Sequence, residues 1–152
     1  MCNNDCEKRE GKGCIAEILK VICVLQEHVS PENVLDTCDR PMLCGGPSAL
    51  VCNTRPIMLY TCCGNGVPWS MPTSKDSVAT CSNTREDSNS PTCSNVFRVE
   101  KLDGNCVTLR VLADNPDQTS LNPYISTNSF FTMDLGCVCV VRCLTDTFVE
   151  AA

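Results

Sequence analysis

The number of cysteines is the feature of this sequence that most limits what the chain can fold into. Fifteen of its 152 residues are cysteine, a density normally found in much shorter disulfide scaffolds. A chain of this length can bury about 70% of its unfolded surface and so form a core without covalent support. We therefore expect that only some of the cysteines stabilise the fold. Because the count is odd, an oxidised monomer keeps at least one thiol that can react with a neighbour.

We do not expect the chain to be carried into an oxidising compartment during synthesis. Glu17 and Lys20 interrupt the first apolar stretch, so no secretory signal is expected. No run reaches the roughly 18 apolar residues of a membrane span. Proteins this rich in cysteine nevertheless belong to oxidising surroundings. We expect synthesis in a reducing cytosol and oxidation after the cell that made the protein has lysed.

The charge distribution limits the partners that the chain can have. The net charge is −6, and no basic cluster occurs. Nucleic acid and anionic membranes are therefore not expected to bind.

The hydrophobic pattern predicts a mainly β protein with one amphipathic helix near the N-terminus. Residues 1–13 are too polar to pack and should form a flexible, cysteine-bearing arm, and residues 14–152 should form a single domain. Apolar residues at helical spacing predict a helix over 14–29, which Ser30-Pro31 ends. The short apolar runs that follow predict an antiparallel two-sheet sandwich with the helix as an appendage. Strands are expected at 49–54, 57–62, 67–69, 77–81, 96–102, 106–112, 130–135 and 137–144, with a shorter one at 147–150.

One hairpin is defined well enough to predict its register. Alternation of apolar and polar residues favours pairing Phe97 with Val111 and Val99 with Leu109. This pairing requires a three-residue loop, 103–105, with its last residue, an asparagine, in the left-handed conformation.

The single histidine, His28, limits the catalytic chemistry that can be considered. A Cys-His or Ser-His-Asp catalyst would have to use it. A histidine in the last turn of a helix is ordinarily solvated and favoured there by the helix dipole. We expect that the protein is not an enzyme, and a cysteine hydrolase using His28 is a third hypothesis.

The spacing of the cysteines favours disulfides over a metal site. No C-x₂-C pair occurs, although Cys2 and Cys6 lie within the spacing that zinc ligands show. Cys137, Cys139 and Cys143 fall at even spacing, on one face of a predicted strand. That arrangement suits bonds to a facing element better than a tetrahedral cage. We expect no metal or other cofactor, and a zinc-binding adaptor is the alternative function.

Position along the chain divides the cysteines into two groups of candidates. Strands fix the backbone, so bridging partners can lie about 5.5–6 Å apart, Cα to Cα. The arm has too few apolar residues to dock on its own domain, and its 13 residues span roughly 20 Å. The candidates for bonds within the chain are Cys106, Cys137, Cys139 and Cys143. The candidates for bonds between subunits are Cys2, Cys6 and Cys14.

Several motifs that occur in order along the chain resemble one family. NTRPIMLYT at Asn53–Thr61, followed by VFRVE, LRVL and STNSFFTMDLGCVCVVRCL, are similar to the CotY/CotZ/ExsY family of spore coat and exosporium proteins of Bacillus-type spore formers. The resemblance covers about residues 51–144. The adjacent pair Cys62-Cys63 and the long segment 82–92 depart from the family pattern.

The resemblance implies a place and a mode of assembly. Family members are cysteine-rich proteins of the outer spore layers, made in the mother-cell cytoplasm, that form cross-linked sheets with hexagonal order. We therefore expect a structural protein whose partners are its own copies, as a hexamer extending into a sheet, and other coat or exosporium proteins. A ring closed by sixfold symmetry needs a second contact to extend in this way.

Overall fold

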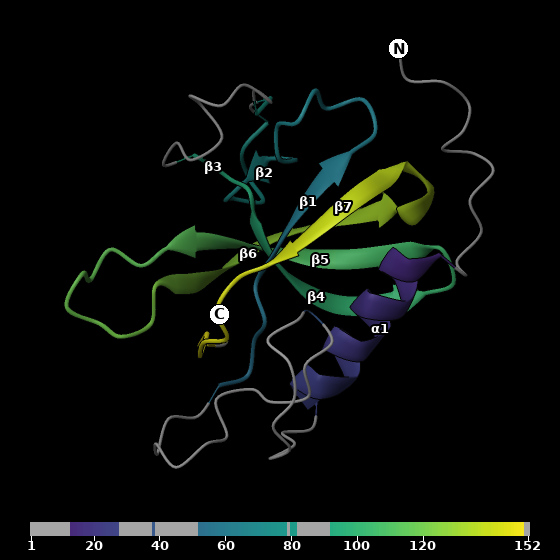
Figure 1. Ribbon diagram of the computed structural model, residues 1–152. Helices are drawn as coiled ribbons and strands as arrows, with labels where there is room; N and C mark the ends of the chain where they lie inside the picture. Colours follow the sequence, from purple (N-terminus) through teal and green to yellow (C-terminus); the bar gives the residue numbers. More distant parts are fainter. Residues whose placement is uncertain (1–12, 28–37, 39–51, 79, 82–91, 151–152) are drawn as a thin grey trace.

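The computed structural model describes residues 13–27, 38, 52–78, 80–81 and 92–150. In these residues it shows one α-helix, a five-stranded antiparallel sheet and a two-stranded sheet (Figure 1). The expected mainly antiparallel β fold with an N-terminal helix is confirmed. The elements are α1 (Cys14–Glu27), β1 (Ile57–Thr61), β2 (Met71–Pro72), β3 (Cys93–Ser94), β4 (Val96–Asp103), β5 (Cys106–Asp114), β6 (Tyr124–Asp134), the 3₁₀-helix η2 (Leu135–Cys137) and β7 (Val138–Cys143).

The five-stranded sheet is strongly curled because its two edge strands are consecutive in the chain. Its strand order is β6-β5-β4-β1-β7, and only η2 joins β6 to β7. Five flat strands would place the edges about 19 Å apart, whereas the step from Asp134 to Val138 spans at most about 14 Å. Leu135 donates a hydrogen bond to the carbonyl of Asn105 (2.8 Å), and Cys62 donates to that of Cys137 (3.1 Å). The short connection therefore holds both edges together at one end of the sheet.

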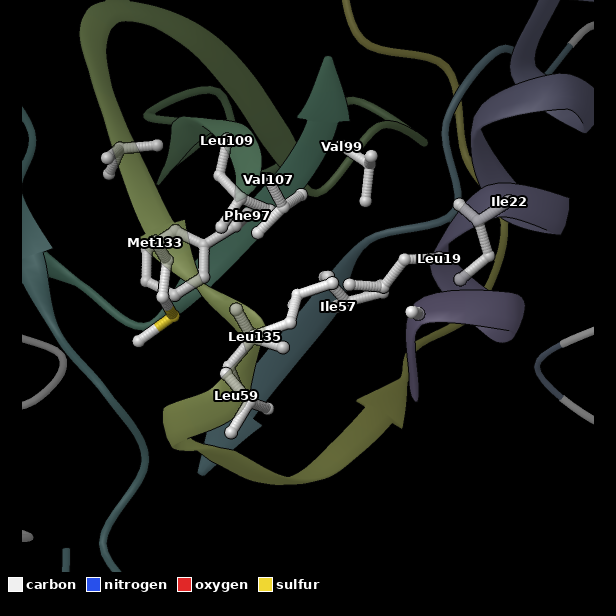
Figure 2. Close-up of a cluster of buried hydrophobic side chains, with 13 residues drawn as sticks. Leu19, Ile22, Ile57, Leu59, Phe97, Val99, Val107, Leu109, Met133 and Leu135 are labelled. Atoms are coloured by element: carbon white, nitrogen blue, oxygen red, sulfur yellow. The ribbon is translucent and has the colours of Figure 1, made fainter. Parts of the chain in front are cut away.

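The concave, inner face of this sheet and helix α1 form the main core. Leu19 and Ile22 of the helix are fully buried among side chains from the sheet (Figure 2). The expectation that the helix is an appendage is therefore wrong. The second sheet, β2–β3, has two residues in each strand, too few to cover an apolar face of this size. The sheet residues of this core are Ile57, Leu59, Phe97, Val99, Val107, Leu109, Val111, Met133 and Val138, with Leu135 from η2.

The β4–β5 hairpin has the expected register but a different turn. Phe97 pairs with Val111, as predicted. The turn, however, contains two residues, Gly104 and Asn105, and the residue with positive φ (+60°) is Gly104. The register is kept because Glu100 forms a bulge in β4. The predicted left-handed asparagine is therefore wrong, and a glycine opens the turn, as type II′ turns require.

The other strands agree with the sequence in part. β6 begins at Tyr124, six residues before its expected start, because the polar segment at 124–129 pairs with the end of β5. Residues 67–69 form no strand, and of 147–150 only Thr147 makes an isolated bridge, to Thr54. The described residues of 77–81 also form no strand. The end of the expected helix at 28–29 and the first half of the strand at 49–54, residues 49–51, lie outside the described residues.

Truncation of the helix tests its place in the core. Leu19→Ala removes a fully buried side chain and should lower the free energy of unfolding by about 2–5 kcal/mol. Val24→Ala, on the same helix but half exposed, should change it by less than about 1 kcal/mol. Denaturant unfolding of the oxidised monomers measures both. An equal, small effect of the two substitutions would show that α1 is an appendage after all.

Candidate cross-linking site

Disulfide bonds join distant segments of the described chain. Cys62 bonds to Cys139, with the Cα atoms 5.3 Å apart, and Cys38 bonds to Cys143 at 5.5 Å. A third bond, Cys81–Cys93, has a Cα separation of 5.9 Å. All three separations are ordinary for disulfides. Cys52 and Cys63 are disulfide-bonded as well.

Two of these bonds attach the edge strand β7 at its two ends. Cys139 lies near the start of β7 and bonds to Cys62, which directly follows β1. Cys143 is the last residue of β7 and bonds to Cys38. Because β7 pairs with β1 alone, these bonds fasten a strand that lies at the edge of the sheet.

A buried ion pair joins the segment that precedes β1 to the segment that follows β7. Arg55 precedes β1, Asp146 follows β7, and their side chains are 2% and 3% exposed. The guanidinium donates to both carboxylate oxygens, at 2.8 and 3.0 Å, and also to the carbonyl of Cys38 at 2.6 Å. Such a two-point contact is among the strongest that side chains make. Breaking a buried pair by removing one partner typically costs about 3–5 kcal/mol.

Two described cysteines have exposed, free thiols. Cys14 is the first residue of α1, and Cys106 is the first residue of β5. Cys106 was expected to bond within the chain. Val107 is buried on the inner face, so its neighbour Cys106 lies on the outer face, where the residues opposite it are Asp103 and Asp134. Neither of the residues that pair with Cys106 in the sheet is a cysteine.

The remaining candidates from the sequence have different placements. Cys139 and Cys143 form the bonds described above, to partners that the sequence did not identify. Cys137 is exposed at the end of η2. Cys2 and Cys6 lie outside the described residues.

Cys14, Cys106 and Cys137 lie at one end of the molecule, which we call the cysteine end. Figure 1 shows the start of α1, the β4–β5 turn and the β6–β7 connection on the same side. The hydrogen bond from Leu135 to Asn105 links the last two. A hollow of about 390 Å³ lies between α1 and the hairpin and is lined by Ala16, Glu17, Lys20, Cys23, Val24, Leu102 and Gly104. This end therefore carries exposed cysteines next to a hollow in the surface.

The part of the chain that the structure describes contains no group of three or more histidine, cysteine, aspartate or glutamate residues able to hold a metal ion. Cys139 and Cys143, two of the three closely spaced cysteines near the C-terminus, are bonded to other cysteines. His28, the residue of the hydrolase hypothesis, lies outside the described residues. No helix in the described ranges has the length and apolar character needed to cross a membrane.

Comparison with known proteins identifies a protein family that the chain matches. A family model described as spore coat protein Z matches residues 2–123, a range that includes α1 and strands β1 to β5. No curated protein and no solved structure matches the chain.

Removal of individual disulfides tests which of them hold the fold together. The Cys62–Cys139 bond closes 77 residues and the Cys81–Cys93 bond closes 12. In the chain-entropy model, a double serine variant of the first pair should lose about 1–2 kcal/mol more unfolding free energy than one of the second pair. Denaturant unfolding of the oxidised, monomeric variants gives the comparison. An equal loss in the two variants, or the reverse order, would contradict this ranking.

Proposed function

Because the chain belongs to the spore coat protein Z family, we propose that it is a structural, non-enzymatic protein of the outer spore layers, in the coat or exosporium. It assembles with copies of itself into a two-dimensional sheet, which disulfide bonds between subunits then harden. The observation that carries this proposal is that exposed thiols remain on a fold whose own segments are already joined by disulfides.

The internal bonds and the exposed thiols have different uses. Cys62–Cys139 and Cys38–Cys143 fasten the edge strand of the sheet. Cys14 and Cys106 make no such bond and face solvent. In a protein that ends in an oxidising environment, exposed thiols are reactive. Bonds to neighbouring subunits give them partners.

Non-covalent contacts set the geometry of the sheet before oxidation. A disulfide forms only where two sulfur atoms are already held close together. Both edge strands present apolar side chains for such contacts, since Phe130 of β6 and Val140 of β7 are about half exposed. Edge strands with exposed apolar residues are prone to pair with other chains. A hexameric ring with a second contact between rings would extend into a sheet.

The proposed place and time of assembly follow from the redox chemistry. The chain is made in the mother-cell cytoplasm, where thiols stay reduced. It assembles there with its own copies and with other coat or exosporium proteins. Lysis of the mother cell then exposes the assembled layer to oxygen. Neighbouring thiols in a lattice are held at about millimolar effective concentration, so oxidation is efficient.

Assembly of the purified protein tests the proposal. Recombinant chain, purified under reductant and then concentrated without it, should form ordered sheets visible by negative-stain electron microscopy. A chain that stays monomeric at high concentration without reductant would contradict the proposed function.

Serine variants of the arm test its part in hardening the sheet. We propose that Cys2 and Cys6 link subunits, because the polar arm can reach across a subunit boundary. A variant with both changed to serine should still form sheets. Without reductant, these should come apart in heat or denaturant far more easily than parent sheets. Sheets of a Cys23→Ser variant, whose thiol is partly buried, serve as the matched control. Equal resistance of the arm variant and the parent would show that the arm is not the cross-linker.

A further inference from the structure

We propose that the cysteine end is a docking surface for a second copy of the chain, in which Cys106 of one subunit bonds to Cys14 of the other. A twofold axis through this end makes both bonds at once. This inference rests on the proposed function and names one of its contacts.

Both thiols are carried by well-packed elements. Cys106 begins β5 and is paired on one side with Asp103 of β4 and on the other with Asp134 of β6. Cys14 begins α1, which the burial of Leu19 and Ile22 fixes against the sheet. A thiol on a fixed backbone loses little conformational freedom when it bonds, so these two positions can define a specific contact.

The surroundings of the two thiols are electrostatically complementary. Asp103 lies directly opposite Cys106, is exposed, and its carboxylate has no hydrogen-bond or ion-pair partner among the described residues. Cys14 lies at the N-terminus of α1, where the first bond within the helix is from Glu17 to Gly13. The N–H groups of residues 14–16 therefore have no partner inside the helix, and the positive end of the helix dipole lies there. The Asp103 carboxylate of one copy would accept hydrogen bonds from the N–H groups at the start of α1 in the other copy. It would also lie at the positive end of that helix dipole.

The same charges disfavour a bond between two copies of Cys106. Each Cys106 lies between Asp103 and Asp134. A symmetric Cys106–Cys106 bond would bring four carboxylates together, and such like-charge contacts oppose association. The mixed bond instead places Cys106 and the carboxylates beside it against a helix N-terminus.

The position of both thiols at one end of the molecule determines the symmetry of the contact. In a twofold contact, residue i of one copy meets residue j of the other, and j meets i. Each contact therefore contains two disulfides. The hollow beside α1 is lined in part by half-exposed Val24. It can accommodate an apolar side chain of the second copy.

The oxidation requires an electron acceptor, which we take to be dioxygen. Four thiols, two from each subunit, lose four hydrogen atoms to one dioxygen molecule. The products are two disulfides and two water molecules. This reaction becomes available when the assembled layer is exposed to air.

Peptide mapping of air-oxidised protein tests the bond. Trypsin should release Cys14 in peptide 13–20 and Cys106 in peptide 102–110. Dimers separated by non-reducing electrophoresis should contain these two peptides joined by a disulfide. In chains whose Cys2 and Cys6 are changed to serine, which removes the arm's own cross-links, Cys106→Ser and Cys14→Ser should each lower the yield of dimer at least tenfold. Cys23→Ser should leave the yield unchanged, and Asp103→Asn should slow dimer formation several-fold at low ionic strength.

The inference is overturned if Cys106→Ser leaves the dimer band unchanged in chains whose Cys2 and Cys6 are serine. It is also overturned if peptide 102–110 of the parent is found joined to itself or to an arm peptide. Electron microscopy separates this outcome from a failure of the proposed function. Parent chains that form sheets without the mapped bond contradict the inference alone. Parent chains that give the mapped dimer but no sheets contradict the proposed function alone.

Discussion

The attachment of β7 to β1 is the constraint on which the rest of the structure depends. β1 is the first strand of the sheet and β7 the last, yet they are neighbours. Bringing them together costs loop-closure entropy, which the disulfides offset by restricting the unfolded chain. Cys62–Cys139 and Cys38–Cys143 hold β7 at its ends, and the buried Arg55–Asp146 pair holds the segments next to both strands. Once β7 is in place, η2 draws β6 toward it, and the curled sheet encloses the core with α1.

This arrangement separates the cysteines by role. Those that fasten β7 are used within the fold. Cys14 and Cys106 begin their elements and lie at the cysteine end, where the structure leaves them exposed. A chain that folds before it is oxidised can therefore form its internal bonds wherever sulfurs already meet. The exposed thiols of Cys14 and Cys106 remain available for the bonds between subunits that we propose. The same chemistry can thus stabilise the subunit first and join subunits later.

The sequence predicted the elements with strong periodicity and missed those defined by distant contacts. The spacing of Leu19 and Ile22 predicted α1, and alternation predicted the pairing of Phe97 with Val111. The early start of β6 was missed because a polar edge strand shows little hydrophobic signal. The location of Cys106 in a strand was predicted, but whether a second cysteine stands opposite depends on the partner strands. The ion pair between Arg55 and Asp146 joins residues that are 91 positions apart in the sequence. No local sequence pattern indicates such a contact.

The central claim is that some cysteines close the fold and others join subunits, and isotope-mixed disulfide mapping tests it most directly. Equal amounts of ¹⁴N- and ¹⁵N-labelled chain would be mixed under reductant, assembled, oxidised in air and digested without reduction. The account predicts that the Cys62–Cys139 and Cys38–Cys143 peptides carry one label each, whereas peptides that contain Cys14 or Cys106 carry both labels in about half of the molecules, as random mixing requires. Mixed labels in the β7 bonds, or single labels alone at Cys14 and Cys106, would contradict it.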